Sequence, residues 1–309
     1  MLQRVTNETI QRSTLRNLQT NLSAVARLQA EMSSGKRIQV PSDDPSGTGQ
    51  SLSLNATASQ LAQYQRNGQD GDSWLTTVDT ALTTALGYLR NARDLVVQSG
   101  DAGLGQTSRN ALADQIDGLK AGLLTQANAR YQGRNVFAGT SDASQAFTVT
   151  TSGDPNAPTY TYAWNGSATA SVDRKIGPST SVRVDTDGSQ AFSWTDASGT
   201  KSTVFALLDK ISAGLRSGTS VTGTLGDIDS SMQSMLTAAA SNGSRQKVLE
   251  NTMSDVSSQQ ITIKGQLSNV EDVDMAATIM NLQMQQVAYQ GALAAGARVL
   301  QPTLLDFLR

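Results

Sequence analysis

The stretch LAQYQRNGQDGDSWLTTVDTALTTALGYLRNARDLVV, residues 61–97, decides the fold class of this chain. Along its whole length, residues recur at alternating steps of three and four: Leu61, Tyr64, Gly68, Gly71, Leu75, Val78, Leu82, Ala85, Leu89, Ala92 and Val96. A sustained seam of this kind predicts one long helix packed in coiled-coil style, with the two glycines as its only interruptions.

Similar seams lie on both sides of this stretch. Towards the N-terminus they comprise Leu15, Leu18, Leu22, Val25 and Met32, and after residue 108 they comprise Leu112, Ile116, Leu119 and Leu123. Near the C-terminus there are two: Leu249, Met253, Val256, Ile263, Leu267 and Val270, then Val273, Ala277, Met280, Met284, Val287, Gly291 and Ala294. Helices joined by short connections pack antiparallel, so both chain ends are expected to contribute to one helical rod.

The middle of the chain, residues 139–203, is rich in Gly, Thr, Ser and Asp. In TYTYAWNGSATASVDRK (159–175), aromatic residues alternate before Asn165-Gly166, which predicts a hairpin turn at that dipeptide. The pattern recurs in SVRVDTDGSQAFSW (181–194), with a second expected turn at Asp187-Gly188. These signals predict a small β-rich insert.

The expected fold is therefore mainly α: a long antiparallel helical coiled-coil rod built from both chain ends, with a small β-rich domain inserted in the middle. Five segments follow: 1–44, a terminal helix and elbow; 45–138, the first half of the rod; 139–217, the β-rich insert with one trailing helix; 218–270, the second half of the rod; and 271–309, the second terminal helix.

The composition excludes most catalytic chemistry. The 309 residues include no cysteine and no histidine, which removes disulfides, thiolate nucleophiles, Ser-His-Asp triads and most zinc or haem sites. A net charge of −2 does not suggest binding to nucleic acid or to an anionic membrane. No apolar run approaches the ~20 residues of a membrane span, and the N-terminus lacks the apolar region of a cleaved secretory signal. We expect a protein that is not an enzyme and has no cofactor or metal.

The loop SSGKRIQVPSDDPSGTG, residues 33–49, is either a ligand-binding loop or a connector. Asp43 and Asp44 are adjacent, so their side chains diverge and do not easily share a metal. Asp44 is better placed to cap a helix that starts with Pro45, and Gly35 suits the C′ position of the preceding helix. With Pro41 in an extended passage, the loop is predicted to be a structural elbow.

Two other stretches have a ligand-binding alternative. GDAGLGQTS (100–108) faintly resembles a phosphate loop, but it follows a helix and lacks GK[ST], which favours an interhelical turn with Thr107 or Ser108 as the next cap. The acidic residues Glu271, Asp272 and Asp274 suit a divalent cation or, more simply, a helix N-terminus. A metal-dependent hydrolase using these aspartates is disfavoured by the absence of histidine.

The two chain ends carry a family resemblance. LQTNLSAVARLQAEMSSGKRIQVPSDDPSGTGQS (18–51) resembles the N-terminal signature of bacterial flagellin-type axial proteins, and LSNVEDVDMAATIMNLQMQQVAYQGALAAGARVLQPTLLDFLR (267–309) resembles their C-terminal segment. MLQRVT (1–6), VPSDDPSG (40–47) and ARYQGRNVFAGT (129–140) are more similar to the hook–filament junction members of this family than to flagellin itself.

This resemblance implies an extracellular structural protein of the flagellum, exported unfolded through the flagellar type III apparatus without a cleaved signal. It implies that copies self-associate in a ring or helical layer, with terminal helices lining the inner tube and the β-rich insert facing outward. The implied partners are an adjacent hook-associated junction protein on the hook side, flagellin on the filament side, and an export chaperone at the C-terminal helices. Two alternatives remain: a short flagellin, and a secreted coiled-coil adhesin or scaffold.

The expected assembly interface combines the terminal seams with the elbow. It comprises Leu15, Leu18, Leu22, Val25, Met32, Arg37, Ile38, Asp43, Asp44, Val273, Met280, Met284, Val287, Ala294, Leu300, Leu304 and Leu308. In the assembled state, Leu15, Leu18, Leu22 and Val25 are expected to pair with Met280, Met284, Val287 and Ala294. Lys36 and Arg37 are expected to pair with Asp43 and Asp44 between neighbouring copies.

Overall fold

The computed structural model describes residues 7–100, 103–154, 157–167, 169–195 and 199–300. The chain divides into two compact units, which are described separately below. One comprises the chain up to Gln60 together with the chain from Gln259 onwards, and the other comprises Leu61–Ser258.

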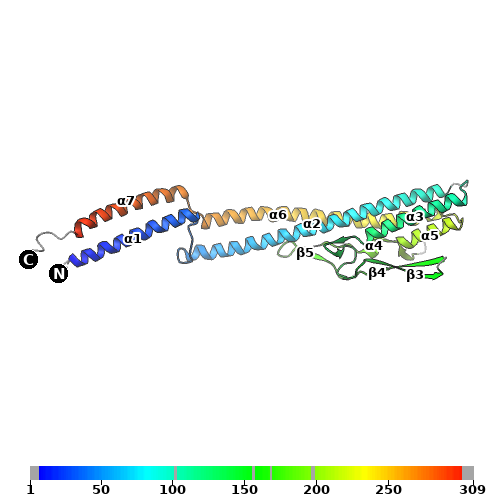
Figure 1. The fold of residues 1–309 in the computed structure, drawn as a ribbon, viewed down its shortest axis with the longest axis horizontal. Helices are drawn as coiled ribbons and strands as arrows, with labels where there is room; N and C mark the ends of the chain where they lie inside the picture. The colour runs from blue at the N-terminus through cyan, green and yellow to red at the C-terminus, as the bar shows by residue number, and fades with distance from the viewer. Residues whose placement is uncertain (1–6, 101–102, 155–156, 168, 196–198, 301–309) are drawn as a thin grey trace, which may run out of the picture. The chain divides into compact units, whose positions relative to one another are not determined.

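The second unit is built on two long helices, α2 (Pro45–Ser99) and α6 (Leu225–Glu271), which extend into it. Within this unit they run antiparallel, because Asn242 donates a hydrogen bond to the carbonyl oxygen of Leu75 at 2.9 Å while Arg93 pairs with Asp229 at 2.9 Å. Figure 1 shows them side by side. All eleven positions of the seam predicted between residues 61 and 96 are buried, so the coiled-coil spacing is confirmed.

The two glycines of that seam are not interruptions. A Cβ at Gly68 would come within 2.8 Å of Met253 Cγ, and one at Gly71 within 3.3 Å of Val184 Cγ1. Their missing side chains let α6 and the β-rich insert approach the α2 backbone closely. Glycine therefore occurs at these two positions because there is no room for a side chain, and α2 continues through both of them.

A second helical pair packs against the insert. Helices α3 (Gln106–Ala127) and α5 (Val204–Arg216) run antiparallel, joined by Lys120 to Asp209 at 2.5 Å and by Ser212 to Asp117 at 3.1 Å. The stretch before α3 is an interhelical connection, as predicted. Its cap is Gly105 and not Thr107 or Ser108, because the helix begins at Gln106.

The described strands form four two-stranded antiparallel sheets. They are β1 (Arg130–Tyr131) with β2 (Arg134–Asn135), β3 (Phe147–Asp154) with β4 (Ala157–Trp164), β5 (Asp173–Lys175) with β6 (Ser181–Arg183), and β7 (Ser193–Thr195) with β8 (Lys201–Thr203). Two short helical segments complete the unit, α4 (Gly188–Ala191) and the 3₁₀ helix η1 (Thr222–Thr224).

Both predicted hairpin turns are wrong. Strand β4 pairs with β3, which precedes it in the chain, so Asn165-Gly166 follows the second strand of a hairpin and does not connect two strands. The Asn165 amide donates to the carbonyl oxygen of Ala146 at 2.9 Å. Asp187 caps α4, accepting a hydrogen bond from the amide of Ser189 at 2.8 Å. Asn and Asp serve caps and loops as readily as hairpin turns, which explains both errors.

An aromatic cluster holds the insert on the helices. Phe192 packs edge-on against Phe137 and Phe147 with ring centroids 5.0 and 5.6 Å apart, and Phe147 lies 5.3 Å from Phe205 of α5. Tyr162 of β4 adds a polar contact, donating to Asp209 Oδ2 at 2.7 Å. The predicted fold class, mainly α with a small β-rich middle region, is confirmed.

The first unit pairs α1 (Asn7–Ser34) with α7 (Met275–Leu300) and includes the first part of α2 and the last part of α6. No helix among the described residues is both long enough and apolar enough to cross a bilayer. The five-segment division drawn from the sequence stays a prediction.

Candidate assembly site

The α1–α2 elbow begins as predicted. Gly35 follows α1 with a φ of +68°, the left-handed conformation that glycine adopts most readily, and its amide donates to the carbonyl oxygen of Glu31 at 2.9 Å. Gly35 therefore occupies the C′ position of α1, and the chain leaves the helix there.

The rest of the elbow is a turn and not an extended passage. The amide of Asp43 donates to the carbonyl oxygen of Val40 at 3.0 Å, which places Pro41 at the second position of a turn, where its fixed φ is favourable. The Asp43 carboxylate accepts hydrogen bonds from the amides of Val40 and Gln39 at 3.0 and 3.1 Å, and these bonds lower the pKa of Asp43. Asp43 thus stabilises the loop locally.

Helix α2 begins with the predicted cap. Asp44 accepts a hydrogen bond from the amide of Gly47 at 2.9 Å, and Pro45 is the first helical residue. A Cβ at Gly47 would come within 2.5 Å of Asp44 Oδ2 and 2.7 Å of Ile38 Cδ1, so a larger residue would have to displace these side chains. Ile38 therefore packs over the first turn of α2.

The elbow is bonded to the break between α6 and α7. The amide of Arg37 donates to the carbonyl oxygen of Glu271 at 2.6 Å, and the amide of Val273 donates to the carbonyl oxygen of Gly35 at 3.0 Å. Lys36 and Asp272 form an isolated antiparallel bridge between the two segments. Two segments more than 200 residues apart in the sequence therefore form one joint, which we call the paired elbow (residues 35–44 and 271–274).

Glu271 is the central side chain of the paired elbow. It is 7% exposed, and Lys36 Nζ lies 2.6 Å from its Oε2, while Ser51 and Asn55 of α2 donate to its Oε1. The hydrogen bond from Lys36, with a second from Ser51, lowers the pKa of Glu271, and the same contact raises the pKa of Lys36. One carboxylate thus connects the elbow, α2 and the end of α6.

The cations of the elbow find their partners within one chain. Arg37 lies 3.3 Å from Asp44 and donates to the carbonyl oxygen of Val270 at 3.0 Å. Lys36 pairs with Glu271 and not with Asp43 or Asp44. The ion pairs that were expected between neighbouring copies therefore form within one chain. Arg37 pairs with Asp44, which is one of the expected partners, whereas Lys36 pairs with Glu271.

Of the acidic residues predicted to mark a helix N-terminus, Asp274 caps α7, whereas Glu271 is the last residue of α6. Asp274 accepts a hydrogen bond from the amide of Ala277 at 3.1 Å, and its carbonyl oxygen accepts one from Thr278. Across the part of the chain that the structure describes, no group of three or more acidic residues is arranged to hold a metal ion.

Helices α1 and α7 pack against each other within one chain. Gln285 donates to Asn21 at 3.3 Å, and Gly296 lies against Thr14 and Leu18, where an added Cβ would come within 3.2 Å of Thr14 Cγ2. The half-buried face of α1 includes Leu18, Val25 and Met32, and that of α7 includes Ala277, Leu282 and Tyr289; Val273, which precedes α7, is half-buried too.

The remaining predicted residues on these helices are mostly exposed, and Met284 lines a depression beside Ala24 and Leu28 of α1. Leu15 and Leu22 of α1 are each 52% exposed, and Met280, Met284 and Val287 of α7 are 61–68% exposed; Ala294 is exposed too. From Met280 onwards the sequence seam therefore describes mainly the exposed side of α7, which we call the outer face, whereas the first two members of the seam, Val273 and Ala277, are half-buried. Small and medium apolar residues cover both faces of α7, so spacing alone did not distinguish them.

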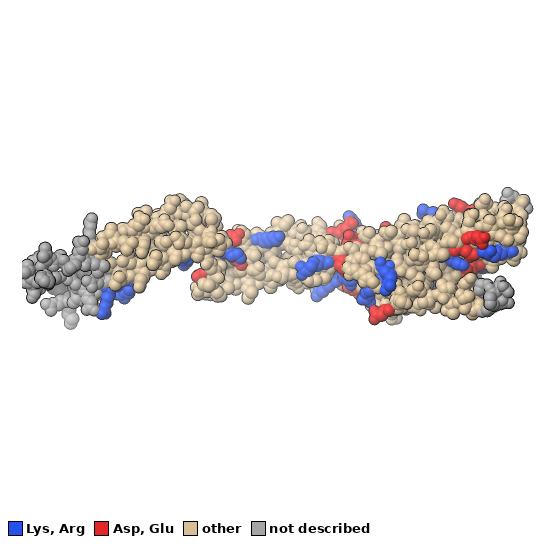
Figure 2. Space-filling model, in the orientation of Figure 1, with Lys and Arg blue, Asp and Glu red and all other residues tan. Residues whose placement is uncertain are grey.

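This outer face is apolar and carries little charge. Figure 2 shows few charged side chains over the α1 and α7 region in that view. Gln283, Met284, Val287 and Ala288 line a shallow apolar depression on α7. The side chain of Leu300 is not described, and Leu304 and Leu308 lie outside the described residues. Exposed apolar stripes of this kind mark interaction sites.

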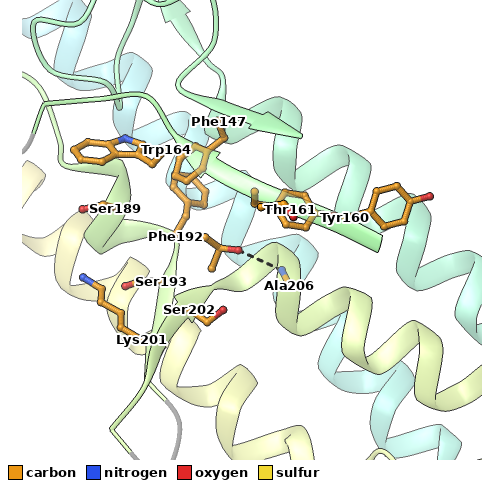
Figure 3. Close-up of a pocket in the computed structure, with 12 residues that line it drawn as sticks. Phe147, Tyr160, Thr161, Trp164, Ser189, Phe192, Ser193, Lys201, Ser202 and Ala206 are labelled. Carbon is orange, nitrogen blue, oxygen red and sulfur yellow. Dashed lines mark hydrogen bonds between the residues drawn. The ribbon is translucent and has the colours of Figure 1, made fainter. Parts of the chain in front are cut away.

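A separate cavity of ≈ 530 Å³ lies on the insert, beside β4, β8 and α5. Figure 3 shows Phe147, Phe192 and Trp164 on one side and Ser189, Ser193, Ser202 and Lys201 on the other. Among the described residues that line this cavity, Lys201 is the only charged one. The described lining of the cavity therefore lacks the pair of acidic and basic groups that general acid–base catalysis uses. Its residues come from strands far apart in the sequence, and no sequence motif indicated it.

Comparison with known proteins identifies the family. The model of the bacterial flagellin N-terminal helical region matches residues 5–142, and that of the bacterial flagellin C-terminal helical region matches residues 225–308. The chain belongs to the bacterial flagellin family. Membership of this family makes it a structural protein and not an enzyme, as the sequence predicts.

Both hook-associated proteins and a flagellin align with this chain over nearly its full length. The chain is 27% identical to flagellar hook-associated protein 3 of Escherichia coli strain K12, over 92% of this chain and 95% of that protein. It is 25% identical to flagellin of Bacillus subtilis strain 168, over 96% of this chain and 97% of that protein. In fold it resembles the flagellar junction protein FlgL of Legionella pneumophila, with a TM-score of 0.57, 15% identity, and coverage of 72% of this chain and 99% of that one.

Proposed function

We propose that this chain is the structural protein that joins the hook to the filament in the bacterial flagellum. The similarity to flagellar hook-associated protein 3 over nearly the full length of both chains carries this proposal. Its fold, shared with a flagellar junction protein, supports it. As a component of the flagellum it acts outside the cell, in contact with neighbouring flagellar proteins.

The assembly surface of this proposal is the outer face of the terminal helices. Leu15, Leu22, Met280, Met284 and Val287 are apolar and exposed in the single chain, so burying them against other copies removes apolar surface from water. The sequence-predicted residues at the inner face, such as Leu18 and Val25, act indirectly by holding α1 on α7.

The finer assignments rest on the family resemblance. They are a hook-associated neighbour on the hook side, flagellin on the filament side, an export chaperone bound at α6 and α7 before secretion, and export without a cleaved signal. The paired elbow supports assembly by fixing how the terminal helices leave α2 and α6.

A second candidate is a short flagellin, which the alignment with the Bacillus subtilis protein along almost the whole chain favours. Electron microscopy of purified protein added to isolated hooks distinguishes the two. A junction protein adds a short layer of fixed length at the hook tip, and its length does not grow with protein concentration. Long filaments whose length increases with concentration support the flagellin assignment instead.

A further inference from the structure

A polar cavity of ≈ 260 Å³ lies where the segment after β6 meets α6, within the second unit. It is lined by Arg183, Thr186, Asp187, Gln190, Ser234, Thr237, Ala238, Ser241 and Arg245. The lining is dominated by hydrogen-bond donors, with two guanidinium groups and four hydroxyls.

Arg245 is a half-buried cation at this cavity whose charge is not balanced by an ion pair with any described residue. Its side chain is half-buried, and it donates to the carbonyl oxygen of Asp185 at 2.8 Å. Within the described residues no carboxylate forms an ion pair with it. Burial, with the like charge of Arg183, lowers the pKa of Arg245. A half-buried cation using one of its five N–H donors on a neutral oxygen is incompletely compensated.

The nearby carboxylates are committed to other groups. Asp185 is fully buried and accepts hydrogen bonds from Arg183 at 2.8 and 3.0 Å and from the amide of Val172 at 2.7 Å. Asp187 accepts from the amide and the hydroxyl of Ser189 at 2.8 and 2.7 Å. Asp173 also acts on both arginines, but only through its charge at a distance.

A second, independent observation concerns Thr186. This residue is 7% exposed, and its hydroxyl oxygen is buried with no hydrogen-bond partner in the part of the chain that the structure describes. A buried hydroxyl without a partner costs free energy, which a group bound at this cavity can offset by accepting its hydrogen bond. Ser241 and Gln190 add side-chain donors at the same cavity that bond to no described residue.

We propose that this cavity binds a small oxyanion, of the phosphate, sulfate or carboxylate class, with Arg245 as its principal ligand. An oxyanion accepts several hydrogen bonds at once, so one such group pairs with the free guanidinium donors of Arg245 and with the hydroxyls of Thr186 and Ser241. The cavity volume accommodates one such group together with water molecules. This site is separate from the assembly surface of α1 and α7.

Isothermal titration of the full chain with inorganic phosphate, and separately with acetate, tests the proposal at constant ionic strength set with chloride. Saturable binding of either anion is expected. Arg245→Met should weaken that binding by about tenfold or more, because a charge-assisted hydrogen-bond set is lost. Thr186→Val should weaken it less, by about threefold to tenfold.

Lys247→Met is the matched control, since Lys247 lies on the same helix, carries the same charge and pairs on the surface with Glu250. It should bind as the unmodified chain does. If Arg245→Met does not fold, Arg245→Lys and Thr186→Val decide the question by the same titration. The proposal is overturned by the absence of saturable binding of both anions, or by equal affinity in the unmodified chain and the Arg245 and Thr186 variants.

Discussion

Lys36 Nζ and Glu271 Oε2 lie 2.6 Å apart, although 235 positions separate the two residues in the chain. The Glu271 side chain is almost fully buried, whereas that of Lys36 is about half exposed. The pair therefore resembles a partly solvated ion pair, whose net contribution is small unless other bonds support it. Here Ser51, Asn55 and two backbone hydrogen bonds across the paired elbow provide that support.

The coupling between Lys36 and Glu271 is measurable. A double-mutant cycle of Lys36→Met and Glu271→Gln should give about 0.5–1 kcal/mol, because Lys36 is partly solvated. Native-state hydrogen exchange at the amides of Arg37 and Val273 reports the opening of the joint. Lys264→Met, which removes an exposed lysine of α6, should leave that exchange unchanged, and equal protection in all variants would show that the pair does not hold the elbow.

The paired elbow should lose stability in acid. Because the folded state lowers the pKa of Glu271, its contribution is complete above the ordinary glutamate value of about 4.3 and is lost as the pH falls through the lowered value. Because the folded state raises the pKa of Lys36, that contribution is complete below about 10.4 and is lost as the pH rises through the raised value. Exchange protection at Arg37 measured from pH 3 to 7 should rise more steeply in the unmodified chain than in Glu271→Gln.

The sequence predicted the parts of the fold that depend on local periodicity. Every position of the seam from Leu61 to Val96 is buried, and Gly35, Asp44 and Pro45 occupy their expected places at helix ends. These features need only neighbours in the chain. The turn at Asn165 failed because its amide bonds to Ala146, a residue that the tertiary structure brings near. The turn at Asp187 failed because Asp also suits the cap of a short helix, where Asp187 accepts a hydrogen bond from Ser189.

The candidate assembly site was predicted only in part, because some of its contacts join segments that are distant in the sequence. The elbow residues were found, but the partner of Lys36 was not, since Glu271 reaches it through the pairing of distant segments. The heptad spacing selected Met280, Met284 and Val287 as the contact residues of α7, but these side chains are exposed. The half-buried residues include Leu282 and Tyr289, which the heptad spacing did not select. The anion-binding cavity at Arg245 combines a loop with a distant helix, which spacing does not reveal.

Two glycines of α3 should respond oppositely to alanine. A Cβ at Gly118 meets nothing within 4 Å, so Gly118→Ala should stabilise the helix by about 0.5–1 kcal/mol. A Cβ at Gly122 would lie 2.9 Å from Cζ of the Tyr88 ring, so overpacking should outweigh the gain and cost about 1–2 kcal/mol net. Urea unfolding of both variants checks this, and a similar gain in both would show that the α2–α3 contact adjusts freely.

Asn242 should tolerate an apolar replacement better than a charged one. It is fully buried between α2 and α6, and its side-chain oxygen has no partner among the described residues. Asn242→Leu removes that oxygen and should change stability by less than about 1.5 kcal/mol. Asn242→Asp buries an unpaired charge and should cost about 3 kcal/mol or more at pH 7.

The penalty for Asn242→Asp should shrink as the pH falls, because burial raises the pKa of the new carboxyl and the folded state then takes up a proton. Thermal unfolding of this variant at pH 7 and pH 5 measures the change. A loss of stability that is the same at both pH values would mean that the carboxylate reaches solvent or a cation.

The assembly surface gives the functional prediction. Val287 is 68% exposed on the outer face of α7, and Leu22 is 52% exposed on α1. Neither contributes to a buried core, so Val287→Asp and Leu22→Asp should leave thermal unfolding of the second unit unchanged. Each should prevent addition to isolated hooks, because a charge buried against another copy is costly.

Ile261→Asp is the control for this experiment, since Ile261 of α6 is 70% exposed and lies outside α1 and α7. We expect this variant to add to hooks as the unmodified chain does. If Ile261→Asp fails as completely as Val287→Asp, the surface is not restricted to the terminal helices. If Val287→Asp and Leu22→Asp both add normally, the outer face of α1 and α7 does not mediate assembly, and the interface must use the inner contact or the paired elbow instead.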